Sequence, residues 1–164
     1  MFEWKLIVLQ NAENVFRIAF RILGSEHDAE DVTQDVFFEA FGLAEPQEVR
    51  DWTGLLRRMA TFRSIDCLRR RRPTSALDVN LPVDADPSSE VVAREMSERL
   101  REAISKLSRQ QAVVFSLAYL ESVSRDEIAE SLGVSPTSVS TALYKARKKL
   151  KSLFFETTQE ITNG

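Results

Sequence analysis

The sequence VSRDEIAESLGVSPTSVSTALYKARKKLKSLF, at residues 123–154, decides how the C-terminal part of the chain folds. It holds two short helix patterns separated by a tight turn. Gly133 stands where the first helix must end, because glycine adopts a left-handed backbone at little cost. Ser124 and Ser135 are suited to cap the two helices, and Pro136 is tolerated at a first helical position, where no amide donor is needed. The stretch therefore predicts a helix-turn-helix.

The outer face of the second predicted helix is polar near its start and basic further along. Residues 140–151 contain five cations and no acid, in a chain whose formal net charge is −3. Short polar side chains at the start of such a helix suit base edges, and cations further along suit phosphates. A hairpin with a solvated face is the alternative, and the run of cations weighs against it. The expected DNA-binding residues here are Ser135, Thr137, Ser138, Thr141, Tyr144, Lys145, Arg147, Lys148 and Lys149.

The composition indicates an all-α protein with a real core. The 164 residues are 43% hydrophobic, with only five glycines and five prolines. The single cysteine, Cys67, excludes an internal disulfide and indicates a reducing compartment. We expect a cytoplasmic protein with no membrane insertion, because Met1–Leu23 carries charges throughout and no apolar run is long enough to span a bilayer.

The sequence contains no set of residues in the spacing typical of an enzyme active site. The one histidine, His27, lies in a predicted turn with no implied acid or serine partner, and there is no Gly-rich phosphate loop or spaced His/Cys set. The sequence therefore predicts no catalysis, no cofactor and no metal.

Charge is segregated along the chain. Residues 26–51 hold nine acids and one arginine, whereas residues 55–72 hold seven arginines and one aspartate. Such alternation indicates more than one charged partner. The next stretch is acidic and rich in proline, which is typical of a linker. The expected organisation is two small helical domains at residues 1–72 and 91–156, a flexible acidic linker at residues 73–90 and a polar tail at residues 157–164.

The acidic segment contains a helix pattern with an unusual outer face. Asp28 is the expected N-cap. Phe38 lies among carboxylates on the side opposite the buried stripe, whereas a solvated helix seldom places an aromatic ring there. An isolated surface apolar residue is the alternative; a docking face for a basic partner is the preferred interpretation. Its expected residues are Asp28, Glu30, Asp31, Gln34, Asp35 and Phe38.

The arginine-rich segment at residues 55–72 has no single apolar stripe, a pattern expected of a helix wedged between neighbours. Asp66 can pair locally with Arg63, Arg69 or Arg70, so it need not be catalytic. A solvated helix end is one interpretation of the arginines. A nucleic-acid surface is the other, with cations for phosphates and aromatic rings for unpaired bases. Its expected residues are Trp52, Arg57, Arg58, Phe62, Arg63, Arg69, Arg70, Arg71 and Arg72.

Three motifs in fixed order carry a family resemblance. They are DAEDVTQDVF at residues 28–37, SIDCLRRRR at residues 64–72, and EIAESLGVSPTSV at residues 127–139, which is followed by KAR at residues 145–147. With them, the chain resembles a bacterial RNA polymerase sigma factor of the extracytoplasmic-function group over residues 2–154. The resemblance implies a transcription initiation factor whose acidic helix binds the polymerase clamp helices. The arginine-rich helix would then read and open the minus-ten element, and the helix-turn-helix would read the minus-thirty-five element.

The implied partners are core RNA polymerase, promoter DNA and an anti-sigma factor. The chain departs from the family pattern at Phe62, where asparagine is usual, and at Leu55, where tryptophan is usual. Ser140 and Ala142 replace basic residues, and Ala112 replaces arginine. Promoter sequence therefore cannot be carried over from the family. Two rival functions are a stand-alone helix-turn-helix regulator and a sigma-like decoy that has lost DNA reading.

Overall fold

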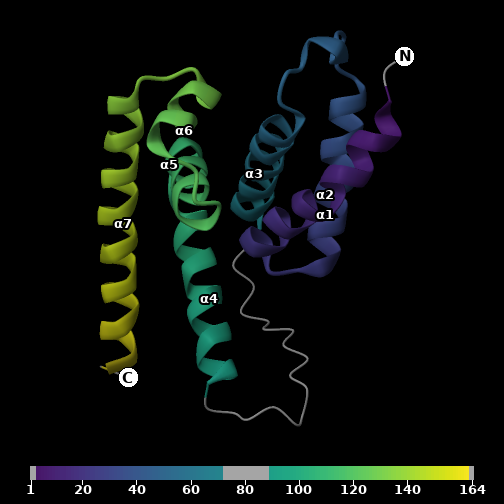
Figure 1. Cartoon of the computed structure of the whole chain (residues 1–164). Helices are drawn as coiled ribbons and strands as arrows, with labels where there is room; N and C mark the ends of the chain where they lie inside the picture. The colour runs from purple at the N-terminus through teal and green to yellow at the C-terminus, as the bar shows by residue number, and fades with distance from the viewer. Residues whose placement is uncertain (1–2, 72–88, 163–164) are drawn as a thin grey trace.

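The computed structural model describes residues 3–71 and 89–162, and every regular element within these ranges is helical (Figure 1). The predicted all-α class is confirmed. The linker predicted at residues 73–90 lies almost wholly outside the described residues, as does Arg72. The first bundle, residues 4–70, consists of α1 (Trp4–Leu23), α2 (Glu26–Phe41), the 3₁₀ turn η1 (Pro46–Glu48) and α3 (Trp52–Arg70). The second bundle, residues 90–162, consists of α4 (Glu90–Ser105), α5 (Arg109–Phe115), the π-helical turn η2 (Ser116–Leu120), α6 (Arg125–Leu132) and α7 (Pro136–Thr162).

The first bundle packs three helices around an aliphatic core. Ile18 of α1, Val36 of α2 and Leu56 of α3 are at most 1% exposed. Gly24 ends α1 with a backbone φ of 65°, where glycine is favoured. The predicted N-cap of α2 is wrong: Ser25 caps the helix, and its hydroxyl accepts a hydrogen bond from the Asp28 amide at 3.2 Å. Asp28 therefore lies inside the first turn, where its carboxylate is free to reach another helix.

The second bundle contains the predicted helix-turn-helix, formed by α6 and α7. Ser124 accepts a hydrogen bond from the Glu127 amide, and Ser135 accepts one from the Ser138 amide at 3.1 Å. Gly133 ends α6 with a φ of 66°. Two caps and one turn of the second bundle therefore follow the local signals in the sequence. The backbone of α7 remains helical to Thr162, within the segment predicted as a polar tail.

The two bundles touch each other mainly through α3, with a further contact from α1. In Figure 1, α3 is the helix of the first bundle that lies nearest to α5 and α6. The Arg58 guanidinium of α3 donates to the backbone carbonyl of Ser131 in α6. From α1, Arg21 donates to the carbonyl of Leu120 at 3.2 Å. Packing on both sides explains why α3 has no single apolar stripe, as the sequence pattern predicted.

Within the described ranges, 3–71 and 89–162, no helix combines the length and the apolar character that crossing a membrane requires.

Candidate functional site

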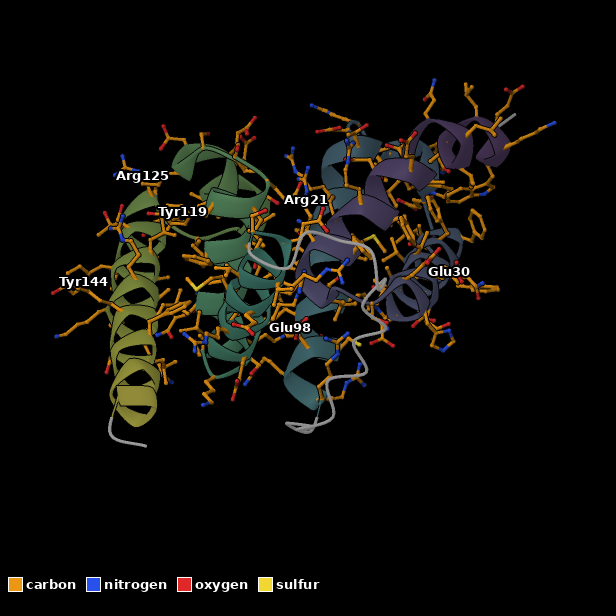
Figure 2. All side chains as sticks on the ribbon, turned by 90° about the horizontal axis from the view of Figure 1, so that it is seen from below. Arg21, Glu30, Glu98, Tyr119, Arg125 and Tyr144 are labelled. Atoms are coloured by element: carbon orange, nitrogen blue, oxygen red, sulfur yellow. The ribbon has the colours of Figure 1, made fainter. Side chains whose placement is uncertain are left out.

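The acidic face of α2 carries the most exposed aromatic ring of the described first bundle. Phe38 is 72% exposed, and Asp31 and Asp35 beside it are also exposed. Figure 2 shows Glu30, on the same helix, on the side of the first bundle that faces away from the second. An exposed apolar side chain with carboxylates on the same helix face is well suited to a partner that offers an apolar pocket and cations.

Asp28 and Arg71, predicted for two different surfaces, bind each other instead. The Arg71 guanidinium forms an ion pair with the Asp28 carboxylate and also donates to the Leu23 carbonyl at 2.7 Å. Both side chains are about one third exposed, at 33% and 31%. The pair ties the end of α3 to the junction of α1 and α2. Any further role of these two residues toward polymerase or DNA stays a prediction.

The arginine-rich face of α3 borders an open cleft of about 960 Å³ between the bundles. Arg63 is bound by Glu39 of the neighbouring helix α2, with nitrogen–oxygen distances of 2.9 and 2.6 Å. This hydrogen bond raises the pKa of Arg63 further, so the side chain stays cationic. Arg69 and Arg70 are exposed, and the Arg70 Nε donates only within its own helix, to the Asp66 carbonyl. The cleft is therefore cationic overall, and part of its charge is already neutralised.

The two aromatic residues predicted to stack on bases are both engaged. Trp52 packs edge-on against Trp4, with ring centroids 5.2 Å apart. Phe62 is covered by the guanidinium of Arg109, whose central carbon lies 4.6 Å from the ring centroid. Base stacking by either ring stays a prediction, and for Phe62 it requires Arg109 to move.

The partner of the Asp66 carboxylate is none of the nearby arginines that the sequence offered. Its carboxylate binds Arg109 of α5 in a bidentate ion pair at 2.8 and 3.1 Å. Asp66 lies on the part of α3 that faces the start of α5, where Arg109 is the first helical residue. The hydrogen bond raises the pKa of Arg109. A residue 43 positions away in the sequence is thus its actual partner.

The outer face of α7 presents most of the residues predicted to read duplex DNA. Tyr144 is 60% exposed and points away from the first bundle (Figure 2). Ser135, Thr137, Ser138, Thr141, Lys145 and Lys148 are also exposed. Two predicted phosphate-binding cations have partners within the bundle. Arg147 donates to the Tyr119 hydroxyl at 2.7 Å, and Lys149 donates to the Lys106 carbonyl at 2.7 Å.

The sequence interpretation missed one cation at this surface. Arg125, the first residue of α6, is exposed and donates to the Ser140 hydroxyl of α7 at 3.1 Å. Its guanidinium therefore lies beside a position where the resemblance led us to expect a basic residue. The available signal was its place directly after the capping Ser124, which puts Arg125 at the end of α6 that lies close to Ser140 in the first turns of α7.

Glu121 is an acid enclosed at the contact between the bundles. Its side chain is only 8% exposed, and Arg21 lies 3.4 Å away. Burial raises the pKa of Glu121, because the carboxylate loses hydration, while Arg21 opposes the shift. Figure 2 shows Arg21 at the boundary between the two bundles.

Comparisons with known proteins agree with this division into two bundles. The family model for Sigma-70 region 2 matches residues 7–74, and the model for Sigma-70, region 4 matches residues 97–150. The chain is 30% identical over 155 residues to the ECF RNA polymerase sigma factor SigE of Mycolicibacterium smegmatis, covering 91% of this chain and 60% of SigE. It is 28% identical over 153 residues to SigW of Bacillus subtilis, covering 85% of this chain and 82% of SigW.

Two solved structures share the fold. One is CnrH in complex with the cytosolic domain of CnrY, with a TM-score of 0.63 and 23% identity, covering 93% of this chain and 87% of that one. The other is the sigma factor RpoE in complex with the anti-sigma factor NepR from Bartonella quintana, with a TM-score of 0.57 and 16% identity, covering 92% and 96%. With both sigma-70 regions matched in order, this chain belongs to the extracytoplasmic-function group of RNA polymerase sigma factors.

Proposed function

We propose that this chain is a promoter-specificity subunit that acts in the cytoplasm. It binds core RNA polymerase and directs the polymerase to a set of promoters. The observation that carries the proposal is the exposed Phe38 among the carboxylates of α2. A solitary regulator of duplex DNA has no use for this face, whereas a polymerase subunit needs one. The chain itself catalyses nothing in this scheme, since the polymerase forms the phosphodiester bonds.

Polymerase docking is assigned to the outer face of α2. Phe38 would enter an apolar pocket, and Asp31 and Asp35 would meet cations at its rim. Gln34 is exposed beside them and can form hydrogen bonds. Apolar burial supplies most of the affinity in such an arrangement, and the charges supply orientation and association rate.

Opening of the minus-ten element is assigned to α3. Arg57, Arg69 and Arg70 would neutralise phosphates of the separated strand, and Phe62 would stack on an unpaired base. A base stacked on an aromatic side chain contributes about 1–3 kcal/mol. Strand separation then exchanges stacking within DNA for stacking and ion pairs with protein, so the complex should weaken as salt is raised.

Recognition of the minus-thirty-five element is assigned to α7 and to Arg125. Thr137, Ser138 and Thr141 would contact base edges, since they lie at the start of the helix, and Lys145 and Lys148 would hold the backbone. Arg125 would supply a phosphate contact beside Ser140, offsetting the basic residue that is missing there.

An anti-sigma factor is the proposed regulatory partner. Support comes from the two structural neighbours, which are complexes with the cytosolic domain of CnrY and with the anti-sigma factor NepR. Nothing in the chain identifies the regulator itself.

Transcription of a genomic library by core polymerase, with and without this protein, tests the proposed function. New start sites that share upstream sequence elements are the expected result. Duplex binding without polymerase, together with no new start sites, would favour a stand-alone regulator. Polymerase binding with no new start sites would favour the decoy.

A further inference from the structure

The cleft that α3 forms with the second bundle has the size and the charge of a site for a small anionic ligand. Its volume of about 960 Å³ falls within the range of roughly 300–1,000 Å³ that small-molecule pockets occupy. Five arginines and two carboxylates line the cleft, which leaves an excess of three positive charges. The arginines are Arg58, Arg63, Arg69, Arg70 and Arg109.

Two of these arginines have guanidinium groups available to a ligand. Arg69 and Arg70 are exposed, and neither forms an ion pair with any part of the chain that the structure describes. Arg70 donates from Nε to the Asp66 carbonyl at 3.2 Å, which leaves its two terminal nitrogens for other partners. Guanidinium groups bind phosphate oxygens in pairs and keep their charge at any ordinary pH. The end of α3 therefore offers a cationic surface suited to a chain of phosphates.

Arg109 supplies a fixed planar surface in the same cleft. The Phe62 ring supports one side of its guanidinium, with 4.6 Å between the central carbon and the ring centroid. The Asp66 carboxylate binds Nε and Nη2 at the edge of the group, at 2.8 and 3.1 Å. The side chain of Arg109 is nevertheless 52% exposed and lines the cleft, so the side opposite Phe62 is open to a ligand. Guanidinium planes stack on nucleobases, and this one is held in position in advance.

We propose that the cleft binds a free nucleoside polyphosphate. The base stacks on the open side of Arg109, and the phosphates bind Arg69 and Arg70. These two arginines follow Asp66, the anchor of Arg109, by one helical turn, or about 5–6 Å along the axis of α3. Met59, half-buried in the lining, offers an apolar contact to the sugar. The proposal involves neither polymerase nor promoter DNA, so it does not rest on the proposed function.

The carboxylates of the lining do not exclude phosphates. Glu39 is bound by Arg63 at 2.6 Å, and Asp66 is bound by Arg109 at 2.8 Å. Each negative charge is therefore balanced by an adjacent guanidinium, and the unbalanced charge is that of the remaining arginines.

The combination of groups selects among small anions. Inorganic phosphates and acidic peptides can pair with Arg69 and Arg70, but they lack a flat ring for the Arg109 plane. A nucleoside without phosphates has the ring and no charge for the two exposed arginines. A nucleoside polyphosphate uses both parts of the cleft at once, and this sets it apart from the other classes.

Equilibrium dialysis of the full chain tests the proposal without polymerase or DNA. The probes are ATP, AMP and inorganic triphosphate, in a buffer whose metal chelator keeps divalent cations off the phosphates. One ATP should bind per chain, about 5- to 100-fold more tightly than inorganic triphosphate, which is the effect of stacking one base. Inorganic triphosphate carries more charge than ATP, so charge alone predicts the opposite order. AMP should bind several-fold more weakly than ATP, because its single phosphate reaches fewer guanidinium groups.

Variants separate the two parts of the cleft. Arg109→Lys keeps the charge and removes the plane, so ATP should lose its advantage while inorganic triphosphate binds as before. Arg69→Gln with Arg70→Gln should weaken both probes by about 2- to 30-fold, the effect of two exposed charged contacts. The matched control is Arg50→Gln with Arg94→Gln, because both residues are exposed and lie outside the lining. The control should bind ATP as the wild type does.

Three results would overturn the proposal. Equal affinity for ATP and inorganic triphosphate would show a surface that attracts anions only. An undiminished advantage of ATP in Arg109→Lys would exclude stacking on the guanidinium. An equal loss of ATP binding in the control and in the Arg69 and Arg70 double variant would show an effect of net charge. Failure of the proposed function is measured separately, as an absence of polymerase binding by the wild type, and leaves ATP binding unaffected.

Discussion

Replacing Phe38 and Asp35 by alanine should strongly weaken the binding of this chain to core polymerase. Burying a whole phenylalanine side chain contributes about 1.5–3 kcal/mol. Phe38 is 72% exposed, so docking has about 1–2 kcal/mol of this burial still to gain. Asp35, at the rim, adds roughly 0.2–1 kcal/mol if its partner is an exposed cation. Together these terms predict a dissociation constant raised by about ten- to a hundredfold.

The assay is fluorescence anisotropy of the labelled chain titrated with core polymerase. The thermal midpoint should not fall in the double variant, because neither side chain is buried in the bundle. Met96→Ala is the matched control, since Met96 is 49% exposed on α4 of the other bundle. Wild-type affinity in a double variant with unchanged melting would refute the assignment of α2 as the docking face.

Three further perturbations follow from single contacts. Arg125→Ala should weaken binding to duplex promoter DNA several-fold and reduce the slope of log affinity against log salt by ~1, as lost phosphate contacts do; an unchanged slope in filter binding would exclude the contact. Glu121→Gln should raise the thermal midpoint at neutral pH, because burial disfavours the ionised carboxyl and holds its pKa above the ordinary value of 4.5. The native state then binds more protons than the unfolded state between pH 4.5 and the raised pKa, so the gain should disappear when melting is measured below that window. Gly133→Ala should cost about 1 kcal/mol in chemical denaturation, since its φ of 66° is left-handed and nothing lies within 4 Å of the added methyl group; a neutral result would mean that the turn between α6 and α7 adapts.

Local features of the fold were predictable because their causes lie within a few residues. Ser124 and Ser135 act as caps through amides three positions on, and Gly133 supplies a left-handed turn at its own position. The misplaced cap of α2 fits the same logic. Ser25 and Asp28 are both good caps, and the sequence offers two competing signals three residues apart, of which Ser25 is the one used.

Contacts between the bundles were not predictable from local spacing. Arg63 lies three positions before Asp66, and Arg69 and Arg70 lie three and four positions after it on the same helix. All three are plausible partners by sequence. Asp66 binds Arg109 instead because α3 is packed against α5. This packing depends on tertiary contacts and not on neighbouring residues in the sequence. The missing apolar stripe of α3 was the one hint, since it indicated neighbours on more than one side.

The count of arginines on α3 therefore overstates the charge available to DNA. Arg63 is held by Glu39, Arg71 by Asp28, and Arg58 by a backbone carbonyl of the second bundle. Two of these contacts lie within the first bundle, whereas the Arg58 contact depends on the second bundle. For α3, the position of the second bundle consequently matters as much as its own sequence.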